Sequence, residues 1–288
     1  MDYNYDTSTL LTIKENIITE EDRYLVGTLY LAPQKNLNNA KYYGVAYDEG
    51  AINLAKVNLC KKATNGCATS CIYHQGIFKT SDFEKNKIKQ ARFKRTFKFL
   101  LQREAFFAQL CKEIAALIRR AKRKGLHPSI QLNGTSDILW EKEAFSYKEE
   151  EYKNIMELFS EVTFFDYTKY DIKKSRKKLP KNYHLTYSRA GKQKGILVDN
   201  WEYLNSLLKD NIDVAIIFSK KMKSKILEES FHNGIKVIDG DIYNYRAYDV
   251  YQRENTGLII AIEAARKTEL TRSGFIIQED SCMQEFLN

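Results

Sequence analysis

The sequence predicts an α/β protein with a parallel sheet and favours a TIM-type (βα) barrel, complete or incomplete. Beyond Pro128, short apolar runs alternate with helical or irregular segments, as expected for parallel strands joined by crossovers. Six such runs, with one or two earlier ones, approach the eight strands of a barrel, and a doubly wound sheet is the alternative. The 288 residues, 43% of them hydrophobic, are enough to bury a large core. We therefore expect one barrel-like domain over residues 1–288.

Before the alternating region, the sequence predicts two strands and a long helical segment. Arg23–Leu31 (RYLVGTLYL) and Lys41–Tyr47 (KYYGVAY) are rich in aromatic and β-branched residues, which favour strands. Residues 82–124 contain neither glycine nor proline and carry apolar residues at helical spacing, which predicts one helix or two. We expect a break near residues 102–104 and an end at Gly125.

The alternating region contains six candidate strands, each followed by polar residues. They are Ser129–Leu132, Val162–Phe165, His184–Tyr187, Val214–Phe218, Lys236–Ile238 and Leu258–Ile262. Helical spacing indicates three helices, at Lys148–Ser160, Trp201–Lys209 and Lys221–Glu229. The chain contains no G-x-G-x-x-G or Walker motif, so no glycine-rich phosphate loop is indicated.

The densest group of candidate metal ligands is Cys60-x6-Cys67-x3-Cys71-x2-His74, in a loop over residues 58–76. Clustered thiolates in an enzyme-sized chain without a secretory signature are more often ligands than disulfide partners, and five cysteines are an odd number. Four donors would complete a tetrahedral zinc site. Three cysteines, with His74 outside the coordination sphere, would hold an iron–sulfur cluster with one iron open. The spacing is that of neither a zinc ribbon nor a radical S-adenosylmethionine enzyme, so both metals are considered.

Polar residues that directly follow the predicted strands are the candidates for catalysis, because active sites of barrels and doubly wound sheets lie at the carboxyl ends of strands. This rule selects Asn133, Ser136, Asp137, Asp166, Lys169, Ser188, Asp239, Asp241 and Arg246. Carboxylates and a lysine on one rim would supply an acid, a base or a nucleophile. Asp137 and Asp166 form the preferred pair, since each follows a strongly apolar run. The alternative is ordinary turn and cap chemistry.

The charge of the chain favours an anionic partner. The formal net charge is +9 and the pI is near 9.1, which suits nucleic acid or a phosphorylated small molecule. The basic residues concentrate in three runs, at 85–98, 119–124 and 173–181. These runs would form a phosphate-binding stripe or simply solvated helix faces. The acidic N-terminus and the lack of an apolar stretch long enough for a bilayer predict a cytoplasmic protein with no membrane contact.

Several motifs together resemble the phage gene-product-eighty-eight family, over roughly residues 53–266. They are ARFKRTFKFLLQREAFFAQLCKEI, LNGTSDILW, FFDYTK, LTYS and VIDGD, of which LNGTSDI followed by DYTK is the most specific. The resemblance implies an origin in a phage or mobile element, hence a host cytoplasm, and a metal-binding role for the three clustered cysteines. It also implies functional positions at Asn133, Ser136, Asp137, Asp166, Lys169, Ser188 and Asp241. The family pattern does not require a histidine at position 74, which weighs against zinc.

Three functions are expected from these features. The first is an iron–sulfur enzyme that modifies a nucleobase or nucleotide, with a layout similar to radical S-adenosylmethionine barrels and possible use of S-adenosylmethionine. The second is a zinc-containing transglycosylase that exchanges a DNA base for a 7-deazaguanine-type base, with Asp137 or Asp166 as nucleophile. The third is a nucleic-acid-binding protein without catalysis, stabilised by a metal.

Overall fold

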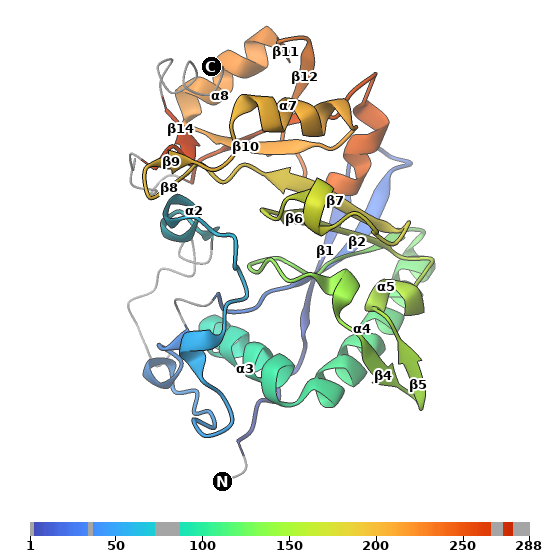
Figure 1. Ribbon diagram of the computed structural model, residues 1–288. Coiled ribbons are helices and arrows are strands. Elements are labelled where there is room, and N and C mark those ends of the chain that lie inside the picture. Colours follow the sequence, from blue (N-terminus) through green and yellow to red (C-terminus); the bar gives the residue numbers. More distant parts are fainter. Residues whose placement is uncertain (1–2, 34–36, 73–86, 266–272, 279–288) are drawn as a thin grey trace. The chain divides into compact units, whose positions relative to one another are not determined.

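The computed structural model describes residues 3–33, 37–72, 87–265 and 273–278, and Figure 1 labels its elements. The protein is a mixed α/β protein with a largely parallel central sheet. The chain divides into two compact units, which are described separately. Unit 1 contains the described residues of Met1–Lys61, Tyr73–Phe164 and Leu179–Tyr183, and unit 2 those of Lys62–Ile72, Phe165–Lys178 and His184–Asn288.

Unit 1 combines a sheet with two long helices. Its elements are β1 (Leu11–Ile17), β2 (Arg23–Leu29), η1 (Lys41–Tyr43), η2 (Leu54–Lys56), α3 (Lys87–Leu101), α4 (Arg103–Lys124), β3 (His127–Gln131), η5 (Trp140–Lys142), β4 (Phe145–Tyr147), β5 (Glu150–Tyr152), α5 (Ile155–Leu158) and the start of β6 (Thr163–Thr168). The order in the sheet is β1-β2-β3-β6. The first pair is antiparallel and the next two are parallel, while β4 and β5 form a separate hairpin.

The helix α4 packs closely on the sheet of unit 1 because β2 has a glycine at the crossing point. A Cβ atom on Gly27 would lie 2.8 Å from Leu117 Cδ1 and 3.1 Å from Ile130 Cδ1, so a larger residue would force these side chains to shift. The apolar face of α4 is buried at Phe107, Leu110, Ile114, Leu117 and Ala121. This one-sided burial leaves the opposite face of the helix to solvent.

Unit 2 contains a parallel sheet with short peripheral hairpins. Its elements are α2 (Asn65–Thr69), the remainder of β6, α6 (Ile172–Ser175), β7 (Tyr183–Ser188), β8 (Lys192–Gln193), β9 (Ile196–Leu197), α7 (Trp201–Lys209), β10 (Val214–Phe218), α8 (Lys220–Glu229), β11 (Phe231–His232), β12 (Ile235–Asp239), η6 (Arg246–Gln252), β13 (Ile259–Glu263) and β14 (Ile276–Ile277). The strand order is β6-β7-β10-β13-β12-β11, with β14 also pairing with β10. The pairs β7–β10, β10–β13, β10–β14 and β12–β13 are parallel. The pair β11–β12 is antiparallel.

Strand β10 continues beyond the carboxyl end of β7 and there pairs with β14. β10 pairs with β7 at Val214 and Ala215, but with β14 at Ile217 and Phe218. The segment before β14 therefore runs beside the residues that follow β7, where the backbone N–H of Lys192 donates to Ser273 O at 2.7 Å. In open parallel sheets, the carboxyl ends of the strands are the usual place for a ligand site.

One face of the sheet in unit 2 is covered by α7 and α8, as Figure 1 shows near β10. Leu204, Leu207 and Leu208 of α7 share a buried cluster with Val214 and Ile216 of β10. Each helix begins where a side chain satisfies a backbone N–H: the side chain of Asn200 accepts from Tyr203 and that of Ser219 from Met222. A smaller apolar cluster that includes Ala215, Ile238 and Ile260 forms the other face.

The six strands predicted after Pro128 are confirmed as β3, β6, β7, β10, β12 and β13. The break in the long helical segment is also confirmed, at Gln102, where φ is −128° and ψ is 54°. Residues 82–86 of that segment lie outside the described residues. A closed barrel is not confirmed. Neighbouring strands of a (βα) barrel follow sequence order, whereas β13 lies between β10 and β12 in unit 2, an order that suits an open sheet.

Two predicted elements are wrong. Lys41–Tyr47 begins with a 3₁₀ helix instead of a strand, ended by Gly44 at φ 69°, and its tyrosines stack on helix α3, with Tyr47 4.8 Å from Phe97. Of the helix predicted over Lys148–Ser160, only α5 (Ile155–Leu158) forms; the first residues belong to the β4–β5 hairpin, because Lys148 and Glu149 take positive φ values of 53° and 67° in a tight turn. No helix in the parts of the chain that the structure places is long and apolar enough to cross a membrane.

Candidate functional site at the carboxyl ends of β6 and β7

The cysteine-bearing helix α2 of unit 2 is anchored to the segment that follows β7. Thr64, at the N-cap of α2, is 3% exposed and donates its hydroxyl hydrogen to Ala190 O at 2.6 Å. The same hydroxyl oxygen accepts from the backbone N–H of Cys67 at 3.3 Å. The N–H of Asn65 also donates to the side-chain oxygen of Gln193 at 3.2 Å. The position of α2 and the residue at which it begins are therefore fixed by Ala190 and Gln193, which follow β7.

Two glycines allow this close packing. A Cβ on Gly66 would lie 2.4 Å from Ser273 Oγ and 2.6 Å from Phe275 Cβ. A Cβ on Gly191 would lie 2.7 Å from the backbone of Phe275, and the φ of Gly191 is 75°. Any side chain at either position would force apart α2, Phe275 and the residues that directly follow β7 (189–191, called the post-β7 segment).

A buried carboxylate holds the post-β7 segment in this conformation. Asp199 is fully buried and accepts hydrogen bonds from the N–H groups of Ala190 and Gly191 and from the hydroxyl of Tyr187. Burial raises the pKa of Asp199, while the charge of Arg189 and the N–H donors oppose the rise. The sequence reading missed Asp199, because it directly precedes a helix N-cap and looks like part of an ordinary turn.

Lys169 and Ser188 meet at the carboxyl ends of β6 and β7. Lys169 Nζ donates to Ser188 Oγ at 2.7 Å and to the carbonyl oxygens of Ser188 and Arg189, both at 3.1 Å. The ammonium also lies 4.9 Å from the centroid of the Phe275 ring. An ammonium has three hydrogens and only donates, so Ser188 Oγ is an acceptor toward Lys169 and keeps its own hydrogen for another partner.

The α2 segment and the Lys169–Ser188 pair thus share neighbours inside unit 2. Phe275 packs against Gly66 on one side and faces the ammonium of Lys169 on the other. A further contact joins Lys62, five residues before Cys67, to the segment after β6, since Lys62 Nζ lies 5.9 Å from the centroid of the Tyr170 ring. Of the predicted residues in unit 2, Lys169 and Ser188 are in contact, and α2 with Cys67 lies beside them.

In unit 1, Cys60 is tied to the loop that follows β3. Its thiol donates to Thr135 O at 3.7 Å, and the adjoining backbone is fixed by the N–H of Asp137, which donates to Leu59 O at 2.7 Å. Thr135 in turn donates to Leu31 O at 2.6 Å. The first cysteine of the motif is therefore also anchored to residues just beyond a parallel strand.

Asn133 organises this loop of unit 1. Its side-chain oxygen accepts from Ser136 Oγ, the N–H of Ile138 and the indole of Trp140, at 2.8, 2.9 and 3.1 Å, and its amide donates to Ile138 O. Asn133 is 5% exposed and Ser136 8%. Most of the hydrogen-bonding capacity of Asn133 is used inside the loop, which favours a positioning role for this residue.

The predicted metal ligands are only partly described. His74 lies outside the described residues, Cys60 belongs to unit 1, and Cys67 and Cys71 belong to unit 2. Across the described ranges, no three or more His, Cys, Asp or Glu side chains form a group able to hold a metal ion, so the metal stays a prediction. The donors themselves suit one, because all three cysteines are partly exposed. Cys111, by contrast, is buried in α4, which raises its pKa to about 12.

The remaining predicted carboxylates differ in accessibility. Asp166 is 1% exposed, whereas Asp137 is partly exposed. Asp241 follows β12 and accepts from Lys223 Nζ at 2.7 Å and from the N–H of Glu263 at 2.8 Å. Lys223 also pairs with Asp239 at 2.5 Å. Burial would lower the pKa of Lys223, but its hydrogen bonds to Asp239 and Asp241 hold the pKa above its usual value.

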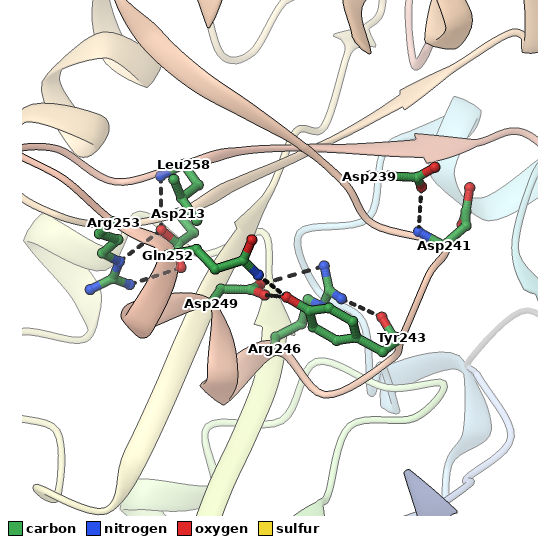
Figure 2. Close-up of polar contacts among 9 residues, drawn as sticks. All are labelled: Asp213, Asp239, Asp241, Tyr243, Arg246, Asp249, Gln252, Arg253 and Leu258. Atoms are coloured by element: carbon green, nitrogen blue, oxygen red, sulfur yellow. Dashed lines mark hydrogen bonds and ion pairs between the residues drawn. The ribbon is translucent and has the colours of Figure 1, made fainter. Parts of the chain in front are cut away.

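Figure 2 shows a buried polar network between Asp241 and the start of β10. Tyr243 donates its hydroxyl hydrogen to Asp249 Oδ1 at 3.0 Å and receives a hydrogen bond from Gln252. Arg246 Nη1 lies 3.4 Å from Asp249 Oδ2, and both side chains are at most 1% exposed. Burial raises the pKa of Asp249 to about 7, with the charge of Arg246 acting in the opposite direction.

The same figure shows how the end of η6 is fixed in unit 2. Arg253 donates twice to the carboxylate of Asp213, at 3.0 and 2.8 Å, and the N–H of Leu258 donates to it at 2.9 Å. Arg246, selected from the sequence as a strand-end candidate, is therefore a buried member of the η6 network. The sequence reading did not identify Asp249 or Asp213.

The basic runs predicted from the sequence have different surroundings. In α3, Arg92 is 2% exposed and lies over the Tyr30 ring, Lys98 is buried with Asp6 as its partner, and Arg95 donates to Thr9 O. At the end of α4, by contrast, all five cations are exposed: Arg119, Arg120, Lys122, Arg123 and Lys124. Three cations of α3, Arg92, Arg95 and Lys98, are thus held by partners in unit 1, whereas Lys87 is exposed, so the phosphate-binding stripe stays a prediction.

The comparisons agree with the resemblance seen in the motifs. Residues 23–279 match the family described as gene product 88, and that stretch includes β2, both long helices, α2 and every strand from β3 to β14. The match gives no support to a radical S-adenosylmethionine layout. No curated protein and no solved structure matches the chain. Because the match spans most of its length, the chain belongs to the gene product 88 family of phage proteins.

Proposed function

We propose that this protein is a metal-dependent enzyme that modifies a nucleobase or nucleotide, with its chemistry at the carboxyl ends of β6 and β7. The observation that carries the proposal is the shared packing in unit 2 of α2, which bears Cys67, with Phe275 and the Lys169–Ser188 pair. A soft-donor segment beside a fixed cation and a hydroxyl at strand ends is an arrangement suited to catalysis.

Cys60, Cys67 and Cys71 would hold the metal, as an iron–sulfur cluster or, with His74, as zinc. When bound, a cluster with an open iron supplies a coordination site for S-adenosylmethionine or substrate. Their partial exposure leaves the three thiols accessible, unlike the buried thiol of Cys111. Thiolates are the form that ligates metals, so accessible thiols fit this role better than a thiol with a raised pKa.

Lys169 and Ser188 would bind the substrate. The ammonium of Lys169 supplies positive charge, and its hydrogen bond to Ser188 Oγ turns the hydroxyl hydrogen toward an acceptor on the substrate. A phosphate or a base carbonyl is such an acceptor. The net charge of +9 suits the same class of substrate.

The transglycosylase alternative has less support. A nucleophilic carboxylate has to reach the sugar, but Asp166 is only 1% exposed. Asp137 is partly exposed, which suits this role better.

The proposal is tested by the nucleosides of DNA and RNA from cells that produce the protein, separated by chromatography and identified by mass spectrometry. A modified nucleoside should accumulate with the native protein and fall at least about tenfold with Lys169→Met or Ser188→Ala, on the scale of a lost transition-state contact. Lys209→Met, at an exposed lysine of the same unit, should leave the amount unchanged. No new nucleoside, together with no turnover of free nucleotides by anaerobically purified protein, would refute the proposal.

A further inference from the structure

We propose that the exposed face of α4 binds polymeric nucleic acid, which makes the substrate a base within a chain and not a free nucleotide. This inference rests on the proposed function for the reaction, but it concerns a different part of the molecule. It is argued from unit 1 alone.

The cations of α4 outnumber its carboxylates, and most make no ion pair within the part of the chain that the structure describes. The helix carries seven basic and two acidic residues. Arg103 pairs with Glu143, and Lys124 pairs with Glu15. One of the two helix carboxylates, Glu113, is occupied by the N–H groups of Leu10 and Leu11. The five other cations make no ion pair with any residue that the structure describes: Lys112, Arg119, Arg120, Lys122 and Arg123.

Three of these cations line one exposed face. Lys112, Arg119 and Arg123 are spaced i, i+7 and i+11, which places them on the same side of a helix. All three are exposed, as is Ala116 between them. At 1.5 Å per residue the row is about 17 Å long, the rise of about five base pairs. Lys122 and Arg120 flank the row.

Helix stability does not explain this arrangement. Cations in the last turn of a helix are favoured by its dipole, which accounts for Lys122, Arg123 and Lys124. Arg119 lies one turn earlier and Lys112 about three turns before the end. Like charges four residues apart, as in Arg119 and Arg123, destabilise a helix. A row of cations that disfavours the free helix is expected where phosphates neutralise it.

The contrast with α3 supports the assignment. Its cations make up a run of similar density in the sequence, but Arg92, Arg95 and Lys98 are each bound to partners in unit 1. The structure therefore separates cations that stabilise the fold from cations that remain available to a partner.

The test measures binding of a fluorescent 30-base-pair duplex of arbitrary sequence across a range of salt concentrations. The native protein should bind with an affinity that falls as salt increases. Arg119→Glu with Arg123→Glu should weaken binding at least about tenfold near 100 mM salt and lower the log–log slope by about 1.8, since each phosphate contact contributes about 0.9. The matched control is Lys220→Glu with Lys221→Glu, which makes the same charge change at exposed lysines of α8 and should have little effect.

Equal weakening by both double variants would indicate a general charge effect and overturn the assignment, as would absence of duplex binding by the native protein. Preferential binding to vesicles with anionic phospholipids, lost in the α4 variant, would also overturn it and point to a membrane surface. Thermal unfolding checks that both variants fold. A native protein that turns over a free nucleotide but binds no duplex would refute polymer recognition alone, whereas a native protein that binds duplex but produces no modified nucleoside would refute only the proposed function.

Discussion

Gly191 lies so close to Phe275 that a Cβ on the glycine would stand 2.7 Å from the backbone nitrogen of Phe275. The φ of Gly191, 75°, also disfavours any other residue. We expect Gly191→Ala to lower the free energy of unfolding by about 3 kcal/mol, part from the backbone conformation and part from the clash. The change should also increase the rate at which Cys67 is alkylated, because α2 packs on the same segment.

Gly195→Ala is the matched control for that change. Gly195 has a φ of 83°, but a Cβ there would meet no atom within 4 Å among the described residues. Gly195→Ala should lower the free energy of unfolding by only the contribution of the backbone conformation, about 1 kcal/mol. Urea unfolding and mass spectrometry of alkylated peptides measure the two effects. An equal loss of unfolding free energy in Gly191→Ala and Gly195→Ala would show that the close approach to Phe275 does not contribute to stability.

Asn133 provides a test of positioning against catalysis. Asn133→Ala leaves the buried donors of Ser136, Ile138 and Trp140 without their acceptor, so we expect a loss of about 3 kcal/mol or more of unfolding free energy. Ser136→Ala removes one hydroxyl and should cost about 1 kcal/mol. If Asn133→Ala instead unfolds like the native protein while the nucleoside product disappears, Asn133 is catalytic and the positioning role is wrong.

The strands were predictable because their signals are local. β10, β12 and β13 are apolar runs bounded by polar residues, and that pattern holds wherever a parallel strand is buried on both faces. β1 was missed, since its burial pattern has one buried residue followed by three exposed ones, as an edge strand does. The hairpin at β4 and β5 was read as a helix because its glutamates and lysines favour helices, whereas the stacking of Phe145 on Phe107 at 4.4 Å depends on the fold.

The candidate site was predictable in part. Lys169 and Ser188 follow predicted strands, so the strand-end rule selected them. Asp199 and Asp249 were not selected, because nothing in the sequence distinguishes a carboxylate in a turn from one that tertiary packing buries. The same limit applies to α3, where helical periodicity does not reveal that Lys98 finds Asp6.

The burial of Asp249 predicts a pH dependence of stability. Its pKa rises to about 7 in the folded protein from the usual value of about 4. Between these values the folded protein binds the proton more tightly than the unfolded chain, so stability should fall as pH rises from about 4 to about 7 and then level off. The full effect is about 4 kcal/mol at most.

Asp249→Asn replaces the carboxylate by a neutral group of the same shape and isolates this contribution. From pH 5 to pH 8, the free energy of unfolding of the native protein should fall by at least about 1 kcal/mol more than that of the variant. Urea titrations at the two pH values give the four numbers required. A native protein whose stability changes no more than that of Asp249→Asn would show that Arg246 keeps the carboxylate ionised throughout.

The metal is the central claim, and its most direct measurement is the metal and sulfide content per chain, with a visible spectrum, of protein purified without oxygen. We expect about four irons or fewer per chain with broad visible absorption, lost on Cys67→Ala but retained on Cys111→Ala, whose thiol is buried in α4. One zinc per chain without colour, lost in the same variant, would replace the cluster by the zinc alternative. A native protein free of iron and zinc, or one whose metal survives Cys67→Ala, would contradict the account.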